Sequence, residues 1–256
     1  MPSKLPDALI GYTGFVGNNL LSQRQFEFLY NSKNIEEIQN KDFDLVVCAA
    51  APSIKWLANK EPEKDLATIA RLITNIKKIK TKKFVLLSTI DVYPSVNGVN
   101  EDAAIKKSDL SPYGKHRLIL EAFITNNFDS LIIRLPAIFG KGLKKNPLFD
   151  LIHNDFKYIN PKSVLQFYCL DYLWADISKS LENNLKVINF ATEPITLGQI
   201  AKEVFNLDIP NKIAISPAFY DMRTKYAYLW RHYNPYLYYK DQVMTDIKMF
   251  VNAYHF

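Results

Sequence analysis

The chain has 256 residues, of which 48% are hydrophobic, so it can bury a sizeable core, and we expect one large domain with at most a small appendage. Its formal net charge of +6 comes from scattered lysines without a nucleic-acid-binding motif, which indicates a solvated surface and excludes nucleic acid as the expected partner. No apolar stretch reaches membrane-spanning length, residues 1–7 lack the apolar run of a signal peptide, and Cys48 and Cys169 are expected to be reduced, buried thiols. We therefore expect a cytoplasmic protein without membrane association.

A glycine turn near the N-terminus is the strongest local pattern. The short apolar run of residues 8–10 leads into Gly11, Gly14 and Gly17, and residues 14–23 have the pattern of a helix. In a dinucleotide-binding fold, the first glycine permits the tight turn, the second lets the backbone approach the pyrophosphate, and the third lets the helix pack on the strand. The helix N-terminus then faces the phosphates. An ordinary surface turn is the alternative, but the order of strand, turn and helix favours dinucleotide binding.

The segment after the next expected strand, at residues 26–30, is where such a fold contacts the adenosine ribose. An acidic residue there accepts hydrogen bonds from the free 2′-hydroxyl of NAD. This chain has Ser32 and Lys33 instead, which suit a 2′-phosphate. The sequence thus favours NADP over NAD, although an ordinary polar turn would look the same.

The following residues alternate between strands and helices. A short helical piece is expected at 33–40, a buried strand at 44–51, a helix at 62–80, a strand at 83–89, a helix from 111 and a strand at 130–135. The small residues Ala49, Ala50 and Ala51 would let a cofactor lie against the backbone. Such alternation predicts right-handed βαβ units, and hence an α/β fold with a Rossmann-like, doubly wound parallel sheet and a small C-terminal substrate-binding lobe.

Four ordered motifs across residues 8–205 resemble those of the extended short-chain dehydrogenase/reductase family, in its nucleotide-sugar epimerase/dehydratase group. They are Gly11-x-x-Gly14-Phe15-x-Gly17, Ser88-Thr89-x-x-Val92-Tyr93, Ser111-Pro112-Tyr113-Gly114 and Arg134-Leu135-Pro136-x-x-Phe139-Gly140. The resemblance implies an NAD(P)-binding Rossmann domain over residues 1–160, to which strands near 164–190 return, and a substrate lobe mainly over 191–256. It also implies a nucleotide-sugar substrate and a homodimer formed through the helices at 62–80 and 113–127.

By this resemblance, Tyr113 transfers the proton and Thr89 hydrogen-bonds the reacting oxygen. A tyrosine can do this if nearby positive charge lowers its pKa from about 10 toward the working pH. The family places a lysine four residues after the tyrosine, where it holds the nicotinamide ribose, but this chain has Arg117. Arginine keeps the charge in a bulkier, planar group. We favour the interpretation that Arg117 does the work of the lysine, and the alternative is an altered site.

The resemblance adds further contacts. Cofactor contacts are expected from Thr13, Phe15, Val16, Ser88 and Pro136, and substrate contacts from Asp91, Lys144 and Asn146. Dehydratases of the group have an acidic pair after the threonine, whereas this chain has only Asp91 there, so reduction or epimerisation is favoured over elimination. Asp91 either contacts a sugar hydroxyl or caps a turn. A dehydratase and a non-catalytic NAD(P) sensor remain alternatives.

Two other patterns are less specific. The four histidines, including His255, lack metal-ligand spacing, so no metal site is expected. The aromatic stretch at residues 219–239 is best interpreted as packing of the C-terminal lobe, with a sugar-stacking surface or a subunit contact as the alternative.

Overall fold

The computed structural model describes residues 4–209 and 215–254, so the first three residues and His255 lie outside the described residues. The described residues divide into two compact units. Unit 1 lies within Met1–Pro94, Ala104–Arg134 and Asp171–Ile188, and unit 2 within Ser95–Ala103, Leu135–Leu170 and Asn189–Phe256.

A six-stranded sheet in the order β10-β6-β4-β3-β1-β2 forms the centre of unit 1. Its strands are β1 (Asp7–Ile10), β2 (Phe28–Tyr30), β3 (Asp42–Cys48), β4 (Lys80–Thr89), β6 (Ser130–Leu135) and β10 (Val187–Asn189). β1 pairs in parallel with β2 and with β3, and β3 pairs in parallel with β4. All residues of β1 and β6 are buried, as expected of parallel strands covered on both faces. The predicted α/β fold with a doubly wound parallel sheet is confirmed.

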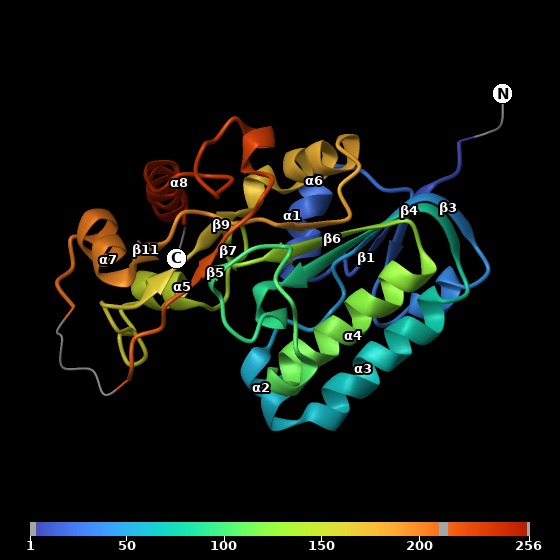
Figure 1. Cartoon of the computed structure of the whole chain (residues 1–256), viewed down its shortest axis with the longest axis horizontal. Helices are drawn as coiled ribbons and strands as arrows, with labels where there is room; N and C mark the ends of the chain where they lie inside the picture. Colours follow the sequence, from blue (N-terminus) through green and yellow to red (C-terminus); the bar gives the residue numbers. More distant parts are fainter. Residues whose placement is uncertain (1–3, 210–214, 255–256) are drawn as a thin grey trace. The chain divides into compact units, whose positions relative to one another are not determined.

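Helices cover both faces of this sheet (Figure 1). α3 (Pro62–Ile76) and α4 (Pro112–Asn127) pack on each other over one face, and α1 (Phe15–Gln23) and α6 (Leu173–Glu182) lie together over the other. The side chains of Ile69, Leu72 and Ile76 recur every three or four residues along α3 and face the sheet, which gives the helix its buried stripe. A short helix, α2 (Lys55–Lys60), precedes α3.

Several boundaries differ from the sequence-based expectations. The helix expected to run to residue 80 ends at Ile76, because Lys80 already pairs with Asp42 as the first residue of β4. The strand expected at 26–30 begins at Phe28, and Phe26 instead packs edge-on against Trp174 of α6, with ring centroids 6.3 Å apart. The strand expected at 44–51 ends at Cys48, so the three alanines follow it.

In unit 2, the described residues form short strand pairs and three helices. β5 (Asn97–Val99) pairs with β12 (Asp221–Met222), β7 (Ala137–Phe139) with β9 (Phe167–Cys169), and β8 (Val164–Leu165) with β11 (Ile195–Thr196). The helices are α5 (Pro147–Ile152), α7 (Leu197–Phe205) and α8 (Lys240–Ala253). Over the part of the chain that the structure describes, the 3₁₀ helices are η1 (Ile35–Ile38), η2 (Ile90–Val92), η3 (Lys107–Asp109), η4 (Leu170–Tyr172) and η5 (Ala227–Trp230).

The aromatic stretch contributes to the interior of unit 2. The Phe190 ring lies 6.5 Å from that of Trp230 and 5.2 Å from that of Tyr168, and Trp230 is 9% exposed. In contrast, Tyr228 and Tyr233 are exposed. The stretch therefore serves mainly for packing, as expected, with a minority of its rings on the surface.

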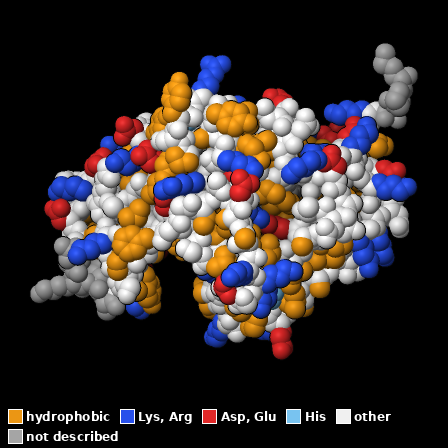
Figure 2. All heavy atoms as spheres, in the orientation of Figure 1, with side chains coloured by type: hydrophobic (Ala, Val, Ile, Leu, Met, Phe, Trp, Pro, Cys, Tyr) orange, Lys and Arg blue, Asp and Glu red, His pale blue; other side chains and the backbone are white. Residues whose placement is uncertain are grey.

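The surface carries mixed charge. On the face shown in Figure 2, Lys and Arg side chains are interspersed with Asp and Glu and do not gather into one patch. Among the described residues, none of the helices combines the length and apolarity needed to cross a lipid bilayer.

Candidate active site

The glycine turn between β1 and α1 is packed so closely that it requires glycine. Gly11 has a φ of +90°, and a Cβ on it would lie 2.6 Å from the carbonyl oxygen of Ala49. A Cβ on Gly17 would lie 2.2 Å from the carbonyl oxygen of Gly11. Gly14 is the N-cap of α1, and no side chain caps this helix end. The turn therefore presents open backbone N–H groups at a helix N-terminus, which fits the phosphates of a dinucleotide.

The sheet topology places this turn where such a ligand binds in open α/β folds. β1 lies between β2 and β3, so the strand order reverses here, and ligands bind beyond the carboxyl ends of the strands at such a switch point. The backbone N–H of Ala49 donates to the carbonyl of Ile10 at 2.8 Å, which joins the end of β3 to the turn. Ala49, Ala50 and Ala51 are half-buried. Thr13 is exposed at the turn, and Phe15 and Val16 are half-buried in the first turn of α1.

Hydrogen bonds of the Asn31 side chain hold the loop after β2 beside the glycine turn. The Asn31 side chain accepts from the Lys33 backbone N–H at 2.8 Å and donates to the Tyr12 hydroxyl at 3.1 Å. Ser32 and Lys33 are exposed. Arg71 of α3, which the sequence analysis did not single out, donates to the Ser32 carbonyl at 3.1 Å and pairs with Glu36 at 2.5 Å. The loop thus has cationic groups close to it, and its nearby acidic side chain, Glu36, is already paired.

Local sequence fixes the start of α4. Pro112 occupies the first turn, and the Ser111 hydroxyl accepts from the Gly114 N–H at 3.4 Å. The Asn59 side chain of α2 accepts from the Tyr113 N–H at 3.0 Å. A Cβ on Gly114 would lie 2.1 Å from the carbonyl oxygen of Asp91, so only glycine lets the helix start rest on η2. These contacts bring Tyr113 to the carboxyl end of β4.

Thr89, Asp91 and Tyr113 come together there. The Thr89 hydroxyl lies 3.2 Å from the Asp91 backbone N–H, from which it accepts, and 3.3 Å from an Asp91 carboxylate oxygen. Tyr113 is 7% exposed. Burial raises the pKa of the Tyr113 phenol, and the Asp91 charge raises it further. The charges of Arg117 and Lys55 and a hydrogen bond with Thr89 lower this pKa, but burial outweighs them, so the net shift is upward.

Arg117 is a fixed, buried cation. It is 2% exposed, and its guanidinium lies over the Tyr113 ring at 4.1 Å from the centroid. Its two terminal nitrogens pair with the Asp65 carboxylate of α3, and one of them also donates to the Pro52 carbonyl. His116 contacts the same carboxylate at 2.7 Å. Among the described residues, Nε of Arg117 has no hydrogen-bond partner. Arg117 and Asp65 therefore form a buried clamp between α3 and α4.

Ser88 has a different environment from Thr89. Successive strand residues point to opposite faces, and the Ser88 hydroxyl donates to the buried carboxylate of Glu121 at 2.5 Å. Arg134 donates to the same carboxylate at 2.7 Å and to the Tyr93 hydroxyl at 2.7 Å. The Ser88 side chain therefore belongs to a buried network that joins β4, α4 and β6.

Three expected contact residues belong to unit 2. Pro136, which follows β6 in the chain, is buried, and Lys144 is exposed. The Asn146 side chain caps α5 by accepting from the Phe149 N–H at 2.9 Å, and it donates to the Ile138 carbonyl at 2.9 Å. The structure thus gives Asn146 a local role in holding α5.

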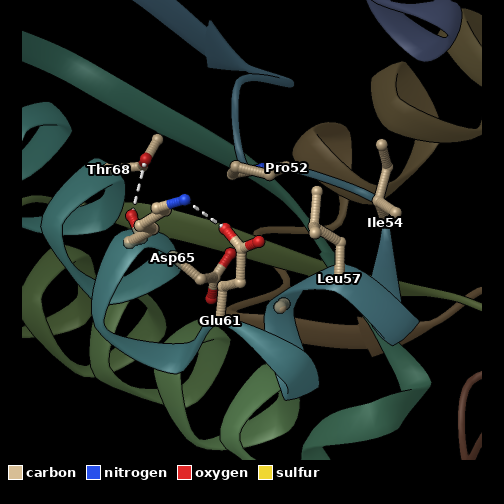
Figure 3. Close-up of a pocket in the computed structure, with 8 residues that line it drawn as sticks. Pro52, Ile54, Leu57, Glu61, Asp65 and Thr68 are labelled. Atoms are coloured by element: carbon tan, nitrogen blue, oxygen red, sulfur yellow. Dashed lines mark hydrogen bonds and ion pairs between the residues drawn. The ribbon is translucent and has the colours of Figure 1, made fainter.

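A small pocket of about 170 Å³ lies between the loop after β3 and the start of α3 (Figure 3). The Glu61–Lys64 ion pair, 2.7 Å long, lies on its wall. Pro52 and Asp65, which hold Arg117, also line it. Its lining residues lie within residues 52–68 and include none of the glycine turn. Among the described residues, no group of His, Cys, Asp and Glu could hold a metal ion.

Known structures share this fold over nearly the whole chain. UDP-N-acetylglucosamine 4-epimerase from Methanobrevibacter ruminantium M1, in complex with UDP-N-acetylmuramic acid, is 16% identical with a TM-score of 0.74, and 98% of each chain is covered. dTDP-4-dehydrorhamnose reductase from Yersinia enterocolitica is 15% identical with a TM-score of 0.71, covering 97% of this chain and 99% of that one. MoeE5, in complex with UDP-glucose and NAD, is 15% identical with a TM-score of 0.70, covering 96% and 97%.

Sequence comparison identifies the family. No curated protein matches the chain. Residues 24–153, about half of the chain, match the model of the NAD dependent epimerase/dehydratase family. The resemblance inferred from the four motifs is confirmed: this chain belongs to the NAD-dependent epimerase/dehydratase family.

Proposed function

We propose that this protein is an NAD(P)-dependent enzyme that reduces or epimerises a sugar carried on a nucleotide. The observation that carries the proposal is the meeting of the Thr89 and Tyr113 side chains at the carboxyl end of β4. In a parallel sheet this is the same edge at which β1 runs into the glycine turn. Solved proteins of the same fold include a UDP-sugar epimerase and a dTDP-sugar reductase, which supports a nucleotide sugar as substrate.

The residues divide the chemistry as follows. A bound nicotinamide cofactor supplies or accepts the hydride. Tyr113 moves the proton at its phenolic oxygen, donating it when a sugar ketone is reduced and accepting it when a hydroxyl is oxidised. Thr89 holds the reacting oxygen by a hydrogen bond, and the Arg117 charge favours the ionised phenol. Because Asp91 is the single acid after Thr89, reduction and epimerisation are favoured over dehydration.

NADP is the favoured cofactor. Ser32 and Lys33 are exposed on a loop held by Asn31, and Arg71 lies against the Ser32 carbonyl. Such a loop suits a 2′-phosphate, which needs cations and hydroxyl donors and is repelled by a free carboxylate. The glycine turn, Ala49–51 and Pro136 would complete the cofactor contacts.

The remaining assignments stay predictions. We expect Asp91 and Lys144 to contact the substrate, whereas the side chain of Asn146 is engaged in capping α5. A dinucleotide-binding domain over residues 1–160 and a substrate lobe mainly over 191–256 also stay predictions; the structure groups residues 135–160 with unit 2. A homodimer through α3 and α4 rests on the family resemblance.

A non-catalytic dinucleotide sensor is the second candidate. It is favoured by two observations: the Arg117 guanidinium is engaged by Asp65 and Pro52, and the pKa of Tyr113 is raised rather than lowered. A sensor, however, has no need of the Thr89 and Tyr113 pair, and this chain has both.

Tyr113→Phe separates the two candidates. Calorimetry with NADP(H) and NAD(H) is expected to show binding that changes by less than about twofold, because the phenol is not needed to hold the cofactor. Turnover of a panel of UDP- and dTDP-linked keto-sugars and their epimers should fall by about 10²- to 10⁴-fold, the usual contribution of a general acid or base. Tyr158→Phe, at an exposed tyrosine of unit 2, is the matched control and should change neither.

Either of two results would overturn the proposal. Unchanged turnover in Tyr113→Phe would show that the phenol is not the proton donor. Cofactor binding without turnover of any sugar in the panel would favour the sensor.

A further inference from the structure

We propose that Lys55 is a positioning residue of this site, whose ammonium holds Asp91 beside Thr89 and provides a second, solvent-accessible positive charge near Tyr113. The inference rests on the proposed function, because it assigns a role to Lys55 in the same proton transfer. Nothing in the four sequence motifs points to this residue.

The first observation is an ion pair across the site. Nζ of Lys55, the first residue of α2, lies 2.5 Å from one carboxylate oxygen of Asp91. The other carboxylate oxygen of Asp91 lies 3.3 Å from the Thr89 hydroxyl. Ammonium, carboxylate and hydroxyl thus form a row that ends at the group proposed to hold the reacting oxygen.

The second observation is that another residue of α2, besides Lys55, contacts the backbone of Tyr113. Asn59 lies four residues after Lys55, on the same face of the helix, and its side chain accepts from the Tyr113 N–H at 3.0 Å. One face of α2 therefore contacts η2 through Lys55 and the start of α4 through Asn59. This places α2 between the two elements that carry Asp91 and Tyr113.

The third observation is the contrast with Arg117. Both terminal nitrogens of that guanidinium are used by Asp65 and Pro52, and the side chain is 2% exposed. The Lys55 side chain is 46% exposed, so its ammonium pairs with Asp91 while remaining partly open to solvent. The buried cation and the solvent-accessible cation of the site are thus different residues in this chain.

The charges facing the Tyr113 phenol come from three elements. Asp91 of η2 raises its pKa, while Arg117 of α4 and Lys55 of α2 lower it, and the Thr89 hydroxyl lowers it by a hydrogen bond. Removing the Lys55 charge takes away one group that lowers the phenol pKa. It also leaves the Asp91 carboxylate without its counter-charge, and this raises the phenol pKa as well. In the oxidative direction, where the phenolate accepts the hydroxyl proton, fewer molecules would then be reactive at neutral pH.

The test is a titration that needs neither cofactor nor substrate. Tyrosine labelled with ¹³C at Cζ is followed by NMR against pH in the full chain, and Tyr113→Phe identifies the Tyr113 signal. In Lys55→Met this signal is expected to move at higher pH than in the wild type, and in Asp91→Asn at lower pH. Lys55→Arg should restore the wild-type titration, since it keeps the charge. Lys60→Met, on the same helix and also exposed, is the control and should change nothing.

Activity gives the second readout. Oxidation of a sugar nucleotide by Lys55→Met should fall at least about threefold at pH 7 and recover as the pH rises, with the KM for the cofactor within about twofold. An unchanged Tyr113 titration in Lys55→Met, or an equal shift in Lys60→Met, would overturn the inference. If instead Tyr113→Phe keeps full turnover, the proposed function fails while the titration still reports on Lys55.

Discussion

The sharpest test of the structure concerns the clamp between α3 and α4. Asp65→Ala removes the carboxylate that pairs with both terminal nitrogens of Arg117 and contacts His116 at 2.7 Å. Arg117 is 2% exposed, so the variant leaves a guanidinium buried without a counter-ion. Breaking a buried pair in this way costs about 3–5 kcal/mol of folding free energy.

Two comparison variants isolate the cause. Glu36→Gln removes a partner of Arg71, but these side chains are 52% and 53% exposed, so the cost should stay within about 0–1 kcal/mol. The double variant Asp65→Ala with Arg117→Met replaces both charged groups by apolar ones. It should recover most of the folding free energy that Asp65→Ala alone loses. Urea unfolding followed by circular dichroism gives the free energy of unfolding for each. If Asp65→Ala costs no more than Glu36→Gln, the clamp is not buried as described and the reasoning fails.

The pH dependence of the same pair has a definite sign. Burial alone raises the pKa of the Asp65 carboxyl, but hydrogen bonds from Arg117 and His116, together with their charges, bring the pKa below its usual value. A carboxyl with a lowered pKa in the folded state stabilises the fold above its unfolded pKa of about 4 and loses that contribution as the pH falls through the folded value. The stability difference between wild type and Asp65→Ala should therefore shrink as the pH falls through the folded-state pKa of Asp65.

Two further predictions concern the backbone and a thiol. In Gly114→Ala, the new Cβ would lie 2.1 Å from the Asp91 carbonyl oxygen, so α4 must shift away from η2. We expect the free energy of unfolding in urea to fall by about 1–3 kcal/mol, and turnover to fall more than cofactor binding. An unfolding curve identical to the wild type would contradict this contact. Burial raises the pKa of the Cys48 thiol to about 11, so iodoacetamide at pH 8 should leave Cys48 unmodified in the native protein and modify it in urea. Mass spectrometry of the peptides measures the modification, and alkylation of Cys48 in the native state would contradict its burial.

The local features of this chain could be predicted because they depend on neighbouring residues. The spacing of Gly11, Gly14 and Gly17 after an apolar run predicts a tight turn, which in the structure requires glycine at positions 11 and 17, and the sheet confirms the predicted fold. Ser111 and Pro112 likewise mark the start of a helix from residue types alone.

The partners of the charged groups could not be predicted because they are distant in sequence. Lys55 and Asp91 are 36 residues apart, and Asp65 and Arg117 are 52 apart. One signal was available, since Asp65 shares a helical face with Ile69 and Leu72, and an acid on an apolar face needs a buried partner. The sequence did not say which cation that partner would be.

Helices α6 and α8 were also missed. In α8 the buried apolar residues form a narrow stripe of Val243, Met244 and Ile247 among polar residues, and the Phe250 ring also packs against that of Phe139. The helix follows the aromatic stretch, whose residues dominate the composition of this region. The tertiary contacts of such a stripe, and not its intrinsic propensity, stabilise the helix.

The Asp65–Arg117 clamp limits which single substitutions position 117 can accept. A lysine at this position would bring one ammonium where a planar fork serves the Asp65 carboxylate and the Pro52 carbonyl together. Some of those acceptors would lose their donor, so Arg117→Lys would be destabilising unless Asp65 changed with it. Positions 65 and 117 are thus mutually dependent, and an effect measured at one has meaning only with the identity of the other stated.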